Sequence, residues 1–107
     1  MIVVTTATIP GSDIAEVLGM VRGSSIRTKH VGKDIIARFR NLAGGEIYEY
    51  TKMLAQAREQ AVDRMVEEGQ VLDADAIVCV RFQTSMVMAG AAEMLCYGTA
   101  VRLARQD

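Results

Sequence analysis

Two cysteines are the residues of this chain whose chemistry is easiest to name. Cys79 and Cys96 stand in two segments of strand-like composition, residues 74–82 and 93–104. Thiolates bind soft metal ions, and a hairpin turning near residues 86–89 would make the two thiols neighbours across the strands. Two thiols are fewer than the four ligands of a structural zinc site. The alternative is that both are small apolar residues packed on their strands.

Other reactive side chains lack evident partners. His30, the single histidine, lies far in sequence from both cysteines, and only a ring of copies would bring such ligands together from several subunits. Ser24 and Ser25 follow a glycine, but G-S-S is not a nucleophile elbow. Arg58 and Glu59 could be half of an active site, or an ion pair with a neighbouring element or subunit. No nucleophile with its base can be assembled, so the sequence predicts a protein that is not an enzyme.

The glycine pair Gly44-Gly45 raises the question of a phosphate site. Backbone N–H groups at a helix N-terminus bind anions. Glu46 and Glu49 follow immediately, would occupy that positive end and would repel a phosphate, and no P-loop or dinucleotide-binding motif is present. We therefore interpret the pair as a bend that side chains would block, from which the helix starts, with an anion site as the alternative.

Composition narrows the classes of partner. The net charge is −1, with 12 basic and 13 acidic residues, so no basic excess is available for a nucleic acid backbone. Uncharged runs reach about a dozen residues, short of the ~20 that a spanning helix needs. Two cysteines without a secretion signal indicate a reducing compartment. We expect a cytoplasmic protein that binds neither nucleic acid nor membrane.

The elements that position these residues follow from hydrophobic periodicity. An apolar stripe at three- and four-residue steps predicts a long helix over 46–68, ended by Gly69. Ala57 and Ala61 in this stripe would let a sheet approach closely. A short helix is predicted over 33–42, and strands are predicted over 1–6, 17–28, 74–82 and 93–104. This order predicts an α+β fold in one domain, residues 1–107, with an antiparallel sheet covered on one face by the long and the short helix.

The apolar content is high for a small monomer. Hydrophobic residues make up 50% of the chain, with seven methionines and no tryptophan. A subunit interface would account for the surplus. The glycines of the second strand, Gly19 and Gly23, indicate a bulge or a close neighbour.

Four stretches carry a resemblance to a known family. TTATIPGSDIAEVLGMVRG, VGKDIIARFRNLAGGEIYEYTKMLAQAREQAVDRM, DADAIVCVRF and YGTAVRL are similar to the YbjQ family, which is labelled as heavy-metal-binding. The resemblance covers nearly the whole chain. It implies a dodecin-like subunit, homopentameric rings and a soft or heavy metal ion as a possible ligand; dodecin-like subunits elsewhere hold flavin, so a small-molecule binder is a further alternative.

The sequence departs from the family pattern at three places. DADA (73–76) replaces a Gly-Ala-Asn-Ala stretch, RFQTS (81–85) has no carboxylate where relatives carry an acidic stretch, and Glu46 stands where relatives have arginine. If those acids hold a metal in relatives, this chain lacks them. The leading expectation is thus a self-assembling protein that is not an enzyme, followed by a metal-binding module in which Cys79 and Cys96 are the candidate ligands.

Overall fold

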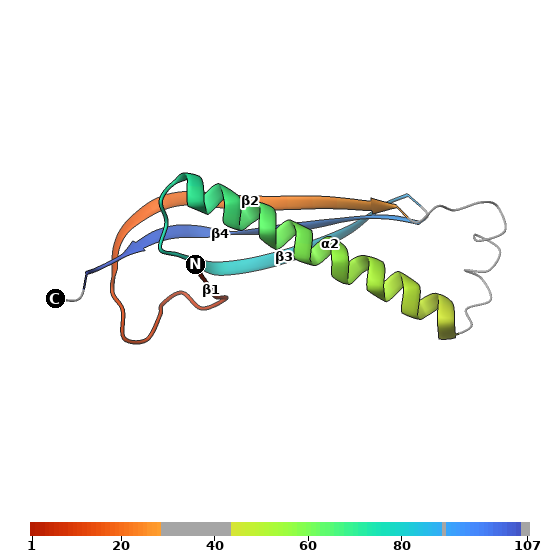
Figure 1. Cartoon of the computed structure of the whole chain (residues 1–107), viewed down its shortest axis with the longest axis horizontal. Coiled ribbons are helices and arrows are strands. Elements are labelled where there is room, and N and C mark those ends of the chain that lie inside the picture. Colours follow the sequence, from red (N-terminus) through yellow and green to blue (C-terminus); the bar gives the residue numbers. More distant parts are fainter. Residues whose placement is uncertain (29–43, 89, 106–107) are drawn as a thin grey trace.

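One long helix lies across one face of a four-stranded sheet. The computed structural model of the chain describes residues 1–28, 44–88 and 90–105 (Figure 1). The elements are β1 (Ile2–Val3), β2 (Ile14–Thr28), α2 (Gly44–Val71), β3 (Ala76–Met88) and β4 (Ala91–Leu103). The predicted α+β architecture is confirmed. The predicted short helix over 33–42 lies outside the described residues.

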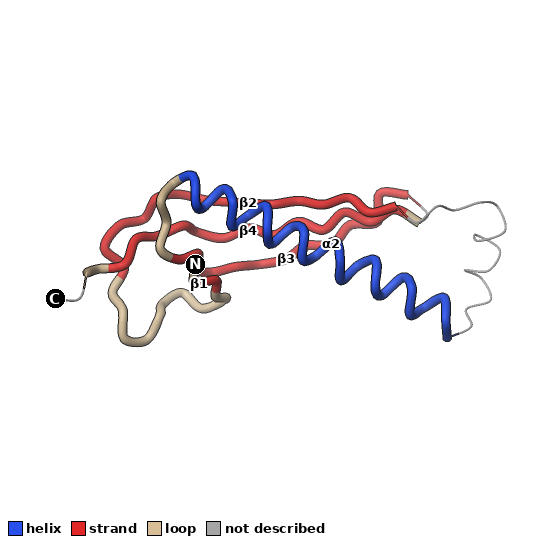
Figure 2. The backbone as a smooth tube through the Cα atoms, in the orientation of Figure 1, coloured by secondary structure: helices blue, strands red, loops and turns tan. Residues whose placement is uncertain are grey.

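The sheet is mixed, which corrects the prediction of a purely antiparallel one. Its order is β1-β3-β4-β2 (Figure 2). β4 pairs antiparallel with both β2 and β3, but β1 runs parallel to β3, with Ile2 opposite Ala76 and Val3 opposite Ile77. The parallel pairing has a packing reason: it lets the residues after β1 fold back over the sheet, where Val4 and Ile9 cover Ala76, Val78 and Val101.

The predicted hairpin of β3 and β4 is present, but its strands are longer than expected. The ladder continues from Phe82 opposite Cys96 to Met88 opposite Ala91. Residues 83–88, which the sequence reading assigned to the connection, are therefore strand. Gly90, with φ of 78°, supplies the positive φ that a tight reversal requires.

The helix and the sheet approach closely at the positions that the small residues predicted. Ala57, Ala61 and Met65 are fully buried, and Gly23 of β2 lies directly below them. A Cβ on Gly23 would collide with the carbonyl oxygen of Ala61 and would lie 2.5 Å from the backbone nitrogen of Met65. The absence of a side chain at this position therefore permits the contact.

The C-terminus of α2 differs from the prediction. Gly69 does not end the helix, which continues to Val71. Asp73, with φ of 59°, takes the left-handed position: its N–H donates to the Gln70 carbonyl at 3.0 Å, and the Ala74 N–H donates to the Gly69 carbonyl at 3.1 Å. These two bonds form a Schellman motif. Gly69 is explained by packing, because a Cβ there would lie 3.2 Å from Cδ1 of Ile77.

The two faces of the sheet are covered unequally. Under α2 lies a core that includes Val21, Ile77, Cys96 and Ala100. On the opposite face, the N-terminal segment covers only the end of the sheet around Ala76, Val78 and Val101, which we call its base. The chain is elongated as a result, with extents of 61 × 22 × 15 Å.

Candidate functional site

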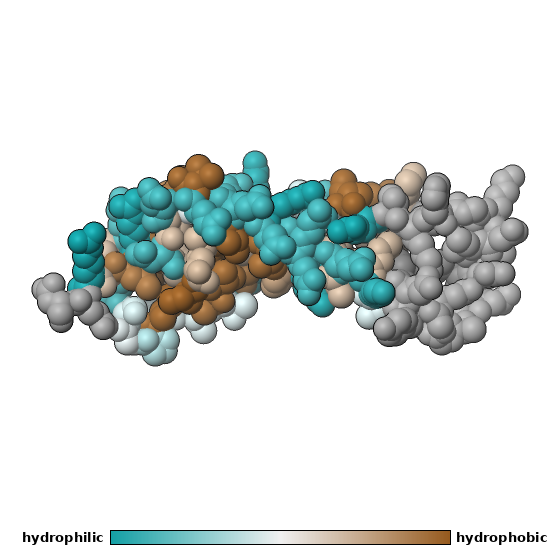
Figure 3. Space-filling view, viewed as in Figure 1, coloured by the Kyte–Doolittle hydropathy of each residue, from teal (hydrophilic) through white to brown (hydrophobic). Residues whose placement is uncertain are grey.

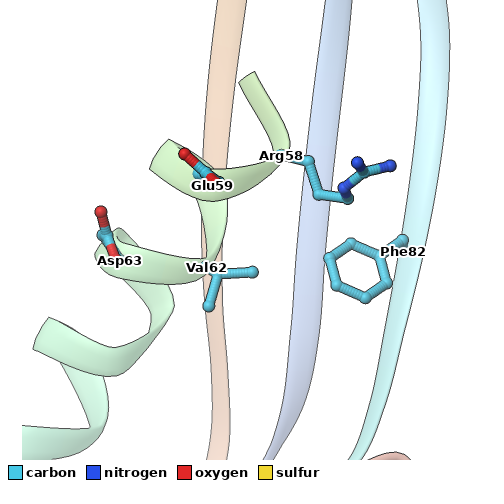
Figure 4. Close-up of a pocket in the computed structure, with 5 residues that line it drawn as sticks. All are labelled: Arg58, Glu59, Val62, Asp63 and Phe82. Carbon is cyan, nitrogen blue, oxygen red and sulfur yellow. The ribbon is translucent and has the colours of Figure 1, made fainter. Parts of the chain in front are cut away.

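Within the described residues, a groove lies between α2 and β3. It arises because α2 packs on β2 and β4 and runs obliquely away from β3 (Figure 1). The groove has a volume of about 460 Å³ and is lined by Arg58, Glu59, Val62, Asp63 and Phe82. Figure 4 shows the Phe82 ring on β3 below the Arg58 side chain, with Val62 beside it. We call this feature the α2–β3 groove.

The groove combines an apolar floor with a charged rim. Phe82 is 45% exposed and Val62 is half-buried, while the carboxylates of Glu59 and Asp63 are carried on the outer side of the helix (Figure 4). An apolar centre with a polar rim is typical of a surface that meets another protein. It is less suited to acid–base chemistry, which needs a reactive group within hydrogen-bond reach of its partner.

The groove contains two residues that the sequence singled out and one that it did not. Arg58 and Glu59 were the candidate half-site, and both line the groove. Phe82 was assigned only to a strand. The alternation that would have revealed it is weak, since all residues from Arg81 to Met88 are exposed.

Cys96 is an internal residue of the core. It is fully buried, and its Sγ–H donates to Sδ of Met65 at 3.3 Å. Burial raises the pKa of the Cys96 thiol, because the thiolate would lose its hydration. The neutral thiol is therefore favoured, whereas a metal ligand must be a thiolate.

Cys79 lies in a different apolar cluster from Cys96. It packs with Val4 and Ile9 at the base of the opposite sheet face, and it occupies the bulge between Val78 and Arg81 with φ of 56°. Phe82, not Cys79, stands opposite Cys96 in the ladder. The structure therefore does not bring the two thiols together as cross-strand partners within one copy.

A heavy-metal ion is held by several donor side chains that lie close together. Within residues 1–28, 44–88 and 90–105, no three His, Cys, Asp or Glu side chains are grouped closely enough to hold an ion. One copy of this part of the chain does not fit a metal site. His30, the remaining candidate ligand, lies outside the described residues.

The glycine pair and the two serines that the sequence singled out lie at the start of α2 and on β2. α2 begins at Gly44, which agrees with the interpretation of Gly44-Gly45 as the start of the helix. Ser25 is buried and its Oγ–H donates to Oε1 of Gln60 at 2.6 Å, whereas Ser24 is exposed. Ser25 thus ties β2 to α2.

Apolar side chains are also present on the surface. In Figure 3 the apolar surface gathers beside α2, where β1 and β3 run in Figure 1, while the helix itself is mostly hydrophilic. The exposed large apolar residues on β2 and β3 are Ile14, Val17, Met20, Ile26, Phe82, Met86, Val87 and Met88. Among the described residues, no helix is both long and apolar enough to cross a membrane.

Comparison with known proteins places this geometry in a family. A YbjQ family model, described as "Putative heavy-metal-binding", matches residues 1–104. The UPF0145 protein of Methanosarcina acetivorans is 59% identical over 103 residues, covering 96% of this chain and 97% of that protein. The UPF0145 protein of Thermosipho africanus is 52% identical over 107 residues, covering 100% and 99%.

A solved structure is similar in fold. The crystal structure of a protein with unknown function from Pediococcus pentosaceus superposes with a TM-score of 0.67 at 19% sequence identity, covering 97% of this chain and 98% of that one. The names of these relatives state no substrate and no activity, so the likeness carries the architecture rather than a reaction.

Proposed function

The chain belongs to the YbjQ family, and from that premise we propose that it is a self-assembling protein without enzymatic activity, whose copies form a homopentameric ring of dodecin-like subunits. The number five and the dodecin-like arrangement come from the family resemblance. The need for a partner comes from the surface of this chain, and the α2–β3 groove is then part of the surface that copies bury.

The observation that carries the proposal is the size of the exposed surface. The chain exposes 7248 Å², whereas a compact monomer of its mass exposes roughly 5,800 Å². The excess of roughly 1,400 Å² means that this chain covers less of its surface than a compact monomer of its mass does. The radius of gyration, 17.8 Å, also exceeds the roughly 13 Å of a compact domain of this length.

The chemistry of that surface supports the same proposal. Met20 on β2 is 66% exposed, and Met86 on β3 is 61% exposed. Apolar residues scattered singly on a surface are ordinary, but here several recur along β2 and along β3, on either side of β4. Exposed apolar residues gathered in this way are typical of a contact with another protein.

Light scattering coupled to size exclusion tests the proposal directly. Five copies of 11.6 kDa give an expected mass of about 58 kDa, and the measurement should be repeated over a hundredfold range of concentration. A single species of 11.6 kDa at every concentration would refute self-assembly. An oligomer of another size would refute only the pentamer.

Heavy-metal binding is the second candidate function. The family description favours it, with Cys79 and Cys96 as the candidate ligands. Metal analysis of protein purified without chelators tests it, with Cys79→Ser and Cys96→Ser as variants. Stoichiometric metal in the wild type that one variant loses would support the candidate. The absence of stoichiometric metal from all three proteins would end it.

A further inference from the structure

The proposed assembly does not specify which surfaces of neighbouring copies meet. The edges of the sheet that lack a paired strand among the described residues indicate which surfaces these are. We propose that the outer edge of β3 beyond Arg81 pairs with the outer edge of β2 from the next copy, so that sheet and helix layer continue from one subunit to the next. This inference rests on the proposed self-assembly and adds the contact strands to it.

The first observation is that β3 has two different halves. At its base it is flanked by the N-terminal segment: the Cys79 N–H donates to the Thr6 carbonyl at 3.0 Å, the Val80 N–H donates to the Val4 carbonyl at 3.1 Å, and the Arg81 side chain reaches the Thr5 carbonyl. Beyond Arg81, no described strand lies along this edge. From there to Met88 every residue is exposed.

The second observation is that this open edge is unguarded. Natural edge strands avoid pairing with other chains by carrying charge or proline or by twisting away. Residues 82–85, FQTS, contain no charge and no proline, and they lie in the regular part of the ladder, before the register shift between Met86 and Met88. Uncharged segments of this composition aggregate when they stay open, so a specific partner strand is expected here.

The third observation identifies the partner edge as β2 rather than a second β3. α2 packs mainly on β2 and β4, and Phe82 on the helix-facing side of β3 stays 45% exposed. Two β3 strands joined to each other would double the width of this exposed strip. A neighbouring β2 arrives with its own α2 above it, through the Gly23 contact, and this second helix closes the far side of the α2–β3 groove.

The charges along the two sides of α2 match this arrangement. Arg58 and Val62 point toward Phe82 in the groove, while the carboxylates of Glu59 and Asp63 lie on the outer side of α2 at the groove rim (Figure 4). The opposite side carries Arg64, whose Nη1 donates to the Ser24 carbonyl on β2. When copies follow one another in the same sense, Arg64 of the next copy approaches an acidic rim.

The direction of the strands allows such copies to close. β2 and β3 both run antiparallel to β4, so they point the same way, and a rotation about an axis along the strands would set β3 beside a parallel β2. A contact between two different edges is heterologous, and repeated heterologous contacts close into a ring when the rotation between copies divides a full turn, and otherwise extend into a filament.

Two edge variants and their mixture provide the test. One variant, Gln83→Lys/Ser85→Lys, places charge on the β3 edge; the other, Ser24→Lys/Ile26→Lys, places charge on the β2 edge; all four positions are exposed. Gln70→Lys/Val71→Lys at the exposed C-terminal end of α2 is the matched control, because it adds the same charge away from residues 82–88 and from Ser24 and Ile26. Masses are measured by light scattering at one concentration.

The proposal expects each edge variant to be an 11.6 kDa monomer while the control keeps the wild-type mass. An equimolar mixture of the two edge variants should give a species of twice the monomer mass, since one intact β3 edge meets one intact β2 edge. That rescue cannot come from unfolded protein, so it also shows that the variants fold.

Three results would overturn the inference. If the β2-edge variant assembles normally while the β3-edge variant does not, two β3 strands pair with each other. If both variants keep the wild-type mass, neither edge is the contact, although self-assembly stands. If the mixture stays monomeric although both variants give the wild-type circular dichroism, the two edges do not meet. A monomeric wild type, by contrast, would refute the proposed function itself.

Hydrogen exchange on the unmodified protein gives an independent reading. Backbone amides of Phe82, Thr84 and their neighbours should exchange slowly at concentrations where the protein is assembled and faster on dilution. Fast exchange throughout residues 82–85 in the assembled protein would contradict strand pairing at this edge.

Discussion

Gly23 of β2 lies against Ala61 of α2 so closely that a Cβ on the glycine would overlap the Ala61 carbonyl oxygen. This contact sets the distance between the helix and the sheet. Both residues are fully covered, with Met65 and Val21 beside them.

The variant Gly23→Ala should therefore be strongly destabilised. The new methyl group meets backbone atoms, which cannot swing aside, so we expect a loss of about 3 kcal/mol in the free energy of unfolding, at the upper end of overpacking effects. Urea unfolding at a fixed protein concentration measures it. The neighbouring exposed position offers the control, since Ser24→Ala should change stability by less than about 0.5 kcal/mol. Equal stability of Gly23→Ala and wild type would show that the helix does not sit at this distance.

The hydrogen bond between Ser25 and Gln60 should behave as a buried pair. Gln60→Leu leaves the Ser25 hydroxyl, only 1% exposed, without its acceptor, and we expect a cost of about 1–3 kcal/mol. The double variant Ser25→Ala/Gln60→Leu removes both polar groups and should recover most of that loss. A thermal or urea double-mutant cycle gives the coupling, and simple additivity of the two single variants would contradict it.

Cys79 should be replaceable by glycine but not by a branched residue. Its φ of 56° lies in the left-handed region, where a β-branched side chain is strained. Cys79→Gly should keep wild-type stability within about 1 kcal/mol, since relief of strain offsets lost packing. Cys79→Val should lose about 1–3 kcal/mol despite its apolar character. If valine proved better tolerated than glycine, the bulge would not depend on this residue.

Stability should fall at alkaline pH through Cys96. Because burial raises the pKa of its thiol in the folded chain above the ordinary value of 9.0, the folded state holds the proton after the unfolded state has lost it. This contribution is complete below about pH 9 and declines as the pH rises through the folded pKa, by at most about 1.4 kcal/mol per pH unit. The difference between wild type and Cys96→Ala, measured from pH 7 to 10.5, isolates it. A difference that stays constant with pH would mean that the thiol is not kept neutral by the core.

The sequence predicted the helix–sheet contact well because the relevant signals are local. The small residues Ala57 and Ala61, one turn apart, are both buried, and Ala61 lies against Gly23. Val21, Gly23 and Ser25 alternate along β2 and are all buried. Family resemblance added the connectivity.

The remaining features depend on contacts that are distant in sequence. The parallel pairing of β1 involves Ile2 and Ala76, and nothing in a two-residue strand announces its partner. The length of β3 was underestimated because residues 83–88 are exposed on both faces, which removes the alternation that identifies a strand. Gly69 was taken for a helix end because glycine is common there, whereas its place against Ile77 is set by tertiary packing.

The bulge at Cys79 lies close to the point where β3 changes from buried to exposed residues. The residues before Arg81 belong to the interior of their own subunit, and the eight from Arg81 to Met88 are all exposed. In a substitution scan along β3, the property that changes should therefore switch near Val80 from stability to assembly. Substitutions before Val80 should lower the stability of the single subunit. Substitutions after it should leave the subunit folded and change only its assembly with other copies.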